Sequence, residues 1–598
     1  MASYPSSSSY KFNTFKGIRT RNGIAANGTI SATVCQNVDF AASSYDAGVL
    51  IRTSYGNCMT SFYSPLYAYV YIDSENVKHI IYITDTTIAA DTTLYDETRT
   101  QNTNPNWAIA EVDNNYVIQY DGHNATYSYS DSTSLWACIK GFETVQEGVN
   151  HLLLYMESET TGRLVEYSGG TFTTLKTGLS VTGQANGITL KNGAYDVFVF
   201  TNGVDYYSVR IYPSLSVTKL TPKYNNVAIT GLPLCEQDGS LVIGGENGIV
   251  LASRKGDITD WDYSTPTDNN KAWYQIFGKK ITAVVPYIDA LLVFTEDDST
   301  VLQGNMSNAN KAVRQDASLG GCMSFESWCR HDKYLFFYDN KQKNIYYYTQ
   351  NDYGQKVLGE PIAPEVQKFF NEVTKLQMVS YIGNNRSEIW LLGDNFKLIY
   401  DYFIGEWSER VCQDLTSYFV YDNEVYSTGA AKCFKEKVGN MCLFDGVFYP
   451  SVYKTQIINL GSFSDMKEME IQPLFSVTAD FNNTFYVDSI INGRKTKTKF
   501  IQSFFQGAIW ADDEEQTEDT PENELWAEDE PTTPGVEQIG QIFPEEDEGN
   551  IRQLKSKFIS NWYFLQFVMR TQEPTQDFSI TCLELKGITS ESDTTGQK

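Results

Sequence analysis

Short apolar runs joined by polar turns recur through the middle of the chain, and this pattern predicts β-hairpins. In the clearest case, Leu241–Ile243 and Ile249–Ala252 flank glycines and an asparagine that accept positive φ in a tight turn. Similar pairs of runs follow at a spacing of roughly 45 residues. They lie at His151–Tyr167, Tyr195–Ile211, Ile288–Gln303, Lys333–Tyr348 and Glu388–Tyr402, with one last, weaker copy at either Thr416–Tyr426 or Met441–Tyr449.

Because a four-stranded blade takes about 45 residues, this spacing predicts a mainly β protein with a β-propeller of about six or seven blades. The 40 Tyr and 33 Phe also favour half-buried strands. A series of unrelated β-sandwich hairpins is the alternative, since the copies diverge in sequence. A helix is expected only at Ile362–Leu376, where Pro364 suits the first turn and apolar residues follow a helical spacing.

The polar turn that follows the clearest hairpin ends in a large aromatic side chain. Gly256 accepts positive φ, and Asp257 and Asp260 can cap their own backbone in such a turn. Trp261 would then anchor the turn against the blade. Gly256, Asp257, Asp260 and Trp261 are therefore predicted to form a structural motif with no catalytic role.

The rest of the chain divides around the propeller, which is placed at residues 61–455. Residues 1–60 are mostly polar and rich in turn formers, which predicts an extended N-terminal arm that gains order by packing on something else. A C-terminal β domain is expected in two parts, 456–511 and 550–598. Between them, 512–549 holds dense carboxylates and no Lys or Arg, which predicts a flexible acidic insertion. The ligand alternation of a calcium loop is absent there.

The net charge of the 598 residues is −28, and such a surface repels nucleic acids and anionic membranes. A nucleic-acid reader is therefore excluded, whereas a conduit through which DNA slides without sticking is compatible with this charge. The 10 cysteines form no CxxC pair, which favours reduced thiols in a protein assembled in the cytoplasm. No secretory signal and no membrane-spanning apolar run are apparent.

Candidate chemistry is sparse. The four histidines are His79, His123, His151 and His331. Only His331 has suggestive neighbours, Cys329 and Asp332, and this spacing alone defines neither a metal site nor a nucleophile. Carboxylate pairs occur at Asp257 with Asp260, Asp297 with Asp298 and Glu406 with Glu409. They fit turn formation better than glycoside hydrolysis. No catalytic, cofactor or metal site is predicted, and the chain is not expected to be an enzyme.

Several phrases, taken in order, resemble the tail nozzle proteins of short-tailed bacteriophages, also called tail stabilisation or tail tubular protein B. The phrases are Gly17–Arg21, Asn37–Phe40 and Ile51–Gly56 near the start, Gly256–Trp261, Ile281–Gly304, Gly320–Ser324 with Tyr334–Phe337, Ile389 with Trp390, and Tyr400–Trp407. The resemblance adds Trp390 and Trp407 to the structural motif residues. The aromatic, Asn- and Asp-rich composition is similar to that of crAss-like phages.

The resemblance implies a structural virion protein that extends and closes the tail channel and conducts the genome during ejection. It implies a homo-oligomer, a hexameric ring, that contacts tail adaptor proteins and tail fibres or fibre-docking proteins. Viral double-stranded DNA would pass through the lumen without specific binding, and the host envelope would be met during infection. Two alternatives stay open: a propeller that binds or hydrolyses carbohydrate, and a receptor- or fibre-docking tail protein.

Overall fold

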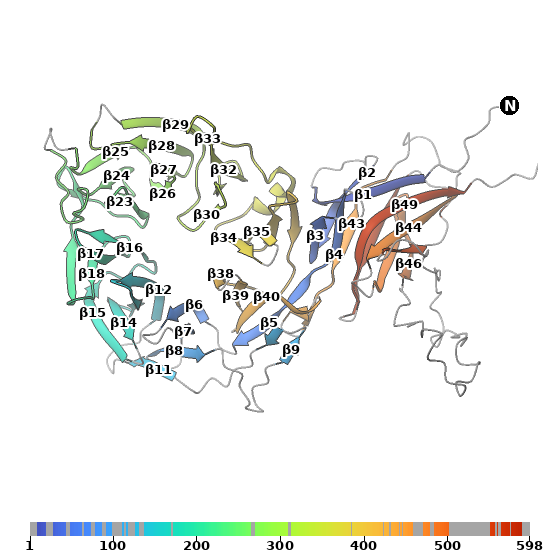
Figure 1. Ribbon diagram of the computed structural model, residues 1–598, viewed down its shortest axis with the longest axis horizontal. Coiled ribbons are helices and arrows are strands. Elements are labelled where there is room, and N and C mark those ends of the chain that lie inside the picture. Colours follow the sequence, from blue (N-terminus) through green and yellow to red (C-terminus); the bar gives the residue numbers. More distant parts are fainter. Residues whose placement is uncertain are drawn as a thin grey trace, which may run out of the picture. The chain divides into compact units, whose positions relative to one another are not determined.

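A computed structural model describes most of the chain (Figure 1). The described residues are 9–19, 28–42, 48–61, 65–72, 78–85, 91–98, 110–112, 115–117, 126–130, 137–168, 171–264, 269–308, 312–383, 386–421, 424–429, 432–441, 443–444, 447–458, 470–478, 483–501, 551–555, 559, 564–573 and 576–588. The predicted acidic insertion 512–549 lies outside these residues. The described chain is almost entirely β, which confirms the predicted class.

Six separate four-stranded antiparallel sheets form the blades of a β-propeller. The first three consist of β6 (Pro65–Ile72), β7 (Lys78–Asp85), β8 (Asp91–Thr98) and β11 (Thr126–Ser130); β12 (Ala137–Gln146), β13 (Val149–Glu157), β14 (Gly162–Ser168) and β15 (Thr171–Leu179); and β16 (Asn186–Asn192), β17 (Tyr195–Thr201), β18 (Tyr206–Arg210) and β19 (Ser216–Leu220). The other three consist of β22 (Leu234–Gln237), β23 (Ser240–Gly244), β24 (Ile249–Ala252) and β25 (Trp273–Ile276); β26 (Ile281–Tyr287), β27 (Ala290–Thr295), β28 (Asp298–Gly304) and β29 (Ala312–Gly320); and β30 (Trp328–His331), β31 (Tyr334–Asp339), β32 (Asn344–Gln350) and β33 (Lys356–Leu358).

The hydrophobic core of the propeller lies between consecutive blades. Tyr155 of β13 packs with Phe200 of β17, their ring centroids 5.0 Å apart. Leu251 of β24 joins side chains of the preceding blade in the next cluster. Phe294 of β27 meets Phe337 of β31 at 4.8 Å. The third, fourth and fifth sheets thus bury both faces against their neighbours, which is why their central strands read as continuous apolar runs.

The predicted hairpins are the central pairs of the blades. The hairpin around Leu241 is β23–β24, and the others match β13–β14, β17–β18, β27–β28 and β31–β32. The hairpin expected at 388–402 falls on β35 (Arg386–Gly393) and β36 (Lys397–Asp401). The outer strands β15, β19 and β25 were not singled out, because half-exposed strands carry a weaker apolar signal.

The predicted helix at 362–376 is wrong in extent. Only Pro364–Phe370 is helical, as the single 3-10 segment η1 of the described chain. The backbone N–H groups of Thr374 and Lys375 donate to the carboxylate of Asp394. These bonds end the helical path, and the chain continues into β34 (Leu376–Gly383), which pairs with β35.

The chain forms two compact units. The propeller unit holds residues 57–397 and 413–436, and the second unit holds 1–56, 398–412 and 437–598. Six further strands belong to the propeller unit: β9 (Ala110–Val112), β10 (Asn115–Val117), β20 (Lys223–Tyr224), β21 (Val227–Ala228), and β38 (Ser417–Tyr421) with β39 (Glu424–Gly429), which form a hairpin.

The second unit is built on one curled sheet in which strands from both ends of the chain pair. Its strand order is β37-β2-β1-β4-β49-β44-β47. The strands are β1 (Ser9–Ile18), β2 (Gly28–Gln36), β3 (Val38–Ala42), β4 (Val49–Thr53), β37 (Glu406–Glu409), β43 (Val452–Thr455), β44 (Glu470–Thr478), β45 (Phe485–Ile491), β46 (Arg494–Ile501), β47 (Ile551–Lys555), β48 (Leu565–Arg570) and β49 (Ser579–Ile588); β5 (Tyr55–Ser61), β40 (Lys432–Met441), β41 (Leu443–Phe444) and β42 (Val447–Phe448) complete the described strands.

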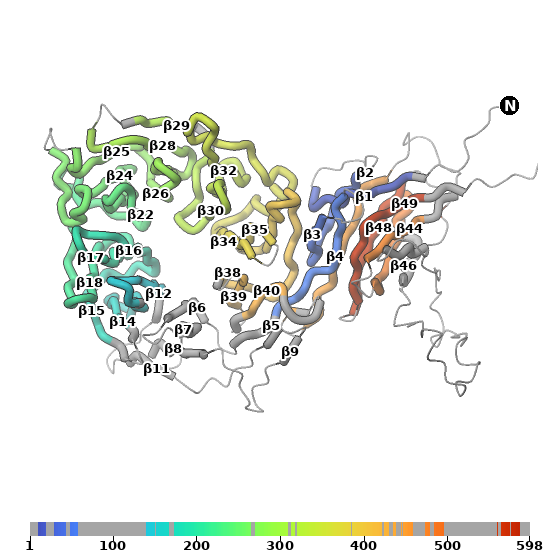
Figure 2. Tube along the Cα trace, in the orientation of Figure 1, coloured from blue at the N-terminus to red at the C-terminus, as the bar shows by residue number. Residues whose placement is uncertain are grey.

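The N-terminal strands therefore find their partners within the chain. β1 runs antiparallel to β49, with Tyr10 opposite Leu585, so the blue and red strands lie together in Figure 2. Phe12, Phe15 and Ile30 are buried in this sheet. Residues 1–56 of the expected arm, 1–60, are thus grouped with the C-terminal β domain, and 437–455, assigned to the propeller from the sequence, belongs to the same unit.

Candidate functional site

The turn Gly256–Trp261 connects two neighbouring blades. Gly256 has a φ of +77°, and its N–H donates to Gly239 O at 2.8 Å while its carbonyl accepts from Gly193 N at 3.0 Å. Ile258 is buried, and its N–H donates to Asn192 Oδ1 at 3.2 Å. Because Asn192 and Gly193 form the tip of β16–β17, these bonds tie the fourth blade to the third.

The two aspartates of this turn cap its backbone. Asp257 Oδ1 accepts hydrogen bonds from both the N–H and the hydroxyl of Thr259, at 2.9 and 2.6 Å. Asp260 Oδ1 accepts from Asp262 N at 2.9 Å. Both carboxylates are therefore taken up locally, as the sequence predicted.

The three tryptophans of the motif lie in different surroundings. Trp261 is half-buried against the cluster between the third and fourth blades, and its buried Nε1 has no hydrogen-bond partner among the described residues. Trp390 is buried on β35, and its Nε1 donates to Glu388 Oε2 at 2.9 Å. Trp407 is buried on β37 in the second unit, 4.7 Å from the ring of Tyr400. Each of the three packs against its own neighbours, which fits three separate packing roles.

The carboxylates of the other two pairs also have hydrogen-bond or ion-pair partners within the fold. Asp297 and Asp298 both accept from Lys279 Nζ, at 3.0 and 2.8 Å. Glu406 accepts from Gly17 N at 2.9 Å and pairs with Arg19 at 2.8 Å. Burial raises the pKa of Glu406 even though Arg19 opposes the shift. None of these pairs presents two free carboxylates across an open space.

His331 is fully buried on β30 and does not meet a metal-ligand set. Burial lowers its pKa, which favours the neutral imidazole. Cys329 is also buried, and burial raises the pKa of its thiol to about 12. No group of three or more His, Cys, Asp or Glu that could hold a metal ion occurs among the described residues.

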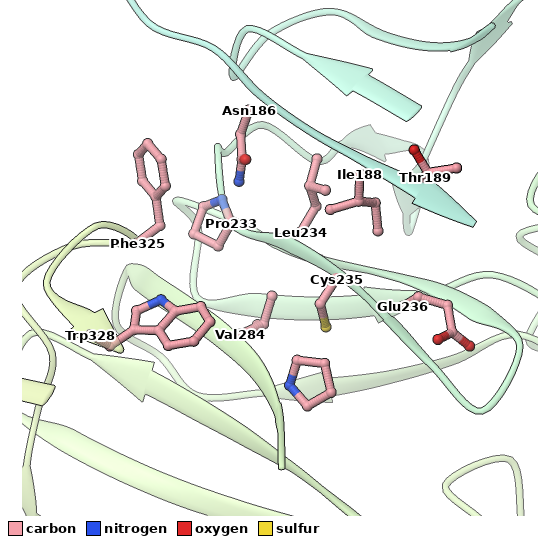
Figure 3. A pocket seen from close by; sticks show the side chains of 11 residues that line it. Asn186, Ile188, Thr189, Pro233, Leu234, Cys235, Glu236, Val284, Phe325 and Trp328 are labelled. Atoms are coloured by element: carbon pink, nitrogen blue, oxygen red, sulfur yellow. The ribbon is translucent and has the colours of Figure 1, made fainter. Parts of the chain in front are cut away.

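A cavity of about 380 Å³ opens among the first strands of successive blades (Figure 3). Figure 1 shows these first strands on the inner side of the ring of blades. Sequence reasoning missed this axial cavity, because its residues come from four blades and share no motif. Its lining residues are Asn186, Ile188, Thr189, Pro233, Leu234, Cys235, Glu236, Val284, Pro286, Phe325 and Trp328.

One end of the axial cavity holds the aromatic side chains with Asn186 beside them, and the other holds Thr189 and the carboxylate of Glu236, as Figure 3 shows. Phe325 and Trp328, both half-buried, form the aromatic end together with Pro233. Thr189 and Glu236 lie at the opposite end. The cavity is thus amphipathic along its length.

The second blade, which contributes no lining residue, also reaches the aromatic end of the axial cavity. Lys140 of β12 lies 5.1 Å above the ring of Phe325 and 3.5 Å from the carboxylate of Glu326. Because the ammonium is already paired with Glu326, it is not a free anion-binding group for the cavity.

Comparisons with known proteins give only distant likenesses. No family model and no curated protein matches the chain. Among solved structures, the computationally designed Ika8 protein is 10% identical, with 64% of this chain and 98% of that chain covered and a TM-score of 0.35. BBS1N in complex with ARL6DN is 13% identical, with 49% and 88% covered and a TM-score of 0.30. The WD40 domain of Toxoplasma gondii coronin is 10% identical, with 48% and 77% covered and a TM-score of 0.30.

The described part of the chain contains no helix that is both long and apolar enough to cross a membrane.

Proposed function

We propose that this chain is a structural subunit of a short-tailed phage tail, which assembles into the nozzle ring that extends and closes the tail channel and conducts the genome. The observation that carries the proposal is the role of the turn Gly256–Trp261, the phrase closest to the tail nozzle pattern. In this chain the turn ties two blades together through backbone bonds. A turn that stabilises the contact between two blades fits a structural subunit.

Two further features support a structural role. The carboxylate pairs singled out in the sequence, and His331, are bound within the fold by hydrogen bonds or ion pairs. The net charge of −28 suits a wall past which DNA slides, because a negative surface does not retain phosphates. In this proposal the lumen is the opening of the ring of subunits, since the axial cavity of one propeller is only about 380 Å³.

The oligomeric state of the purified chain tests the proposal. We expect mass photometry and negative-stain images to show a closed ring, a hexamer of 67.6 kDa subunits, because head-to-tail interfaces that close give cyclic symmetry. Antibodies against the chain should label the tail end of the virion. A chain that stays a monomer at micromolar concentration and is absent from virions would contradict the proposal.

DNA binding and catalysis supply a second test. A 100-bp duplex should show no mobility shift with the ring at physiological salt, and nanomolar binding would exclude a non-sticking conduit. Once the lumen-facing carboxylates are identified in the ring, replacing several of them with Lys should slow genome ejection, whereas Gln replacements should not. Hydrolysis of a polysaccharide by the purified chain would favour the carbohydrate-active alternative.

A further inference from the structure

The polar groups of the axial cavity are mostly committed to the fold. Asn186 Nδ2 donates to Leu232 O at 3.0 Å, and Asn186 Oδ1 accepts from Gly187 N at 2.9 Å. The Thr189 hydroxyl donates to Thr144 at 2.8 Å. A ligand rich in hydroxyls, such as a sugar, would leave most of its polar groups unpaired against the apolar lining, and each unpaired group costs binding free energy.

Glu236 is the one acidic side chain in the lining. Its Oε1 accepts from Gly239 N at 2.6 Å, while its Oε2 has no partner among the described residues. No Lys or Arg lines the cavity, and the nearby Lys140 is paired with Glu326. An anion would therefore meet a carboxylate without a compensating cation, whereas a cation would be attracted.

The opposite end of the axial cavity favours an apolar body on the ligand. Trp328 and Phe325 offer aromatic surface there, and Pro233 and Val284 add apolar surface beside them. The volume of about 380 Å³ lies in the range of small-molecule sites. The net charge of the chain also raises the local concentration of cations.

We propose that the axial cavity is a binding site for a small organic cation, an amine whose apolar body packs against Trp328 and whose ammonium pairs with Glu236. The site is separate from the proposed tail role, since it lies within one propeller. The proposal stands or falls independently of ring formation.

Three probes of similar shape and different charge test it: 2-phenylethylamine, 2-phenylethanol and 3-phenylpropionate. Binding to the full chain is measured by calorimetry in low salt. We expect the amine to bind most tightly, the alcohol about fivefold more weakly and the carboxylate not at all, because an exposed ion pair contributes modestly. Equal binding of all three, or no binding of the amine at 10 mM (roughly the weakest useful affinity), would overturn the proposal.

Variants assign the binding to the cavity. Glu236→Gln should weaken the amine about fivefold and leave the alcohol unchanged. Glu372→Gln, at an exposed glutamate that does not line the cavity, is the matched control and should change neither. An unchanged amine affinity in Glu236→Gln would contradict the assignment.

A spectroscopic reading distinguishes this cavity from other surfaces. The chain is labelled with 5-fluorotryptophan, and the 19F resonance that disappears in Trp328→Phe is assigned to Trp328. The amine should shift this resonance in the full chain. A shift confined to other tryptophan resonances would place the binding elsewhere and refute the proposed site.

Discussion

The imidazole Nε2 of His331 lies 2.7 Å from the hydroxyl of Ser387, within the propeller unit. Its Nδ1 lies 2.9 Å from the hydroxyl of Ser380. His331 is on β30, and the two serines are on the hairpin β34–β35. The imidazole of His331 therefore joins the sixth blade to the hairpin that follows it in the chain. A neutral imidazole satisfies both contacts, because one nitrogen donates and the other accepts.

This bridge predicts a loss of stability in acid. Burial lowers the pKa of His331 below its usual 6.5, so the unfolded chain binds a proton that the folded chain resists. The contribution of His331 is complete above pH 6.5 and is lost as the pH falls toward the folded-state pKa. We expect the difference in unfolding free energy between the native chain and His331→Asn to shrink as the pH falls from 8 to 5. The slope should not exceed about 1.4 kcal/mol per pH unit. Urea denaturation at several pH values measures it, and a difference that grows in acid would contradict the neutral bridge.

A second prediction contrasts two glycines. A Cβ at Gly17 would lie 2.2 Å from the carbonyl oxygen of Trp407, so Gly17→Ala forces backbone apart and should cost about 3 kcal/mol or more. At Gly256 nothing lies within 4 Å of the added Cβ, and only the positive φ opposes the change. Gly256→Ala should therefore cost about 1 kcal/mol. Chemical denaturation of both variants measures the difference in their unfolding free energies. Equal decreases in the two variants would show that the close approach of Gly17 to Trp407 does not constrain the sheet.

A third prediction concerns the anchor of the blade-joining turn. Trp261 is only half-buried, so Trp261→Ala should cost about 2 kcal/mol, less than the 3–5 kcal/mol typical of a fully buried aromatic residue. Trp261→Phe keeps part of the packing and removes the buried Nε1–H that lacks an acceptor among the described residues. It should cost less than about 1 kcal/mol. Tyr353→Ala, at a side chain that is 90% exposed, is the control and should change stability by less than about 0.5 kcal/mol. A larger loss in the Phe variant than in the Ala variant would contradict this packing.

A fourth prediction concerns the thiols. Cys322 and Cys329 are buried, and burial raises the pKa of each to about 12. Because the thiolate is the reactive form, iodoacetamide should leave both unmodified in the folded chain at pH 8 and modify both in 6 M guanidinium. Peptide mass spectrometry measures the extent at each residue. Rapid modification of Cys329 in the folded chain would show that the sixth blade opens readily.

Much of the propeller could be predicted from the sequence, because the central strands of the third, fourth and fifth blades are buried on both faces. Runs such as Leu241–Ile243 and Leu291–Phe294 are apolar throughout for this reason. The joining turn was also readable, since Asp257 and Asp260 cap their own backbone and need no distant partner.

The axial cavity and the second unit could not be predicted in the same way. Glu236 and Trp328 are 92 positions apart (328 minus 236), and only the curvature of the ring brings their strands around one space. Strand β1 pairs with the nearby β2, but its antiparallel partner, β49, begins only at Ser579, so residues 1–60 looked like a polar arm. Pairings over such sequence distances leave no local pattern in either strand.

The pairing of β1 with β49 constrains the order in which the chain can fold during synthesis. A ribosome releases the first strand of the curled sheet long before it makes the last one, and the whole propeller is synthesised in the interval. The blades have contacts that are closer in sequence, so they can fold before β49 is made. Until then, the edge of β1 that pairs with β49 stays unpaired. Any truncation before residue 579 would leave that edge exposed, so a shortened product should aggregate even though its blades are intact.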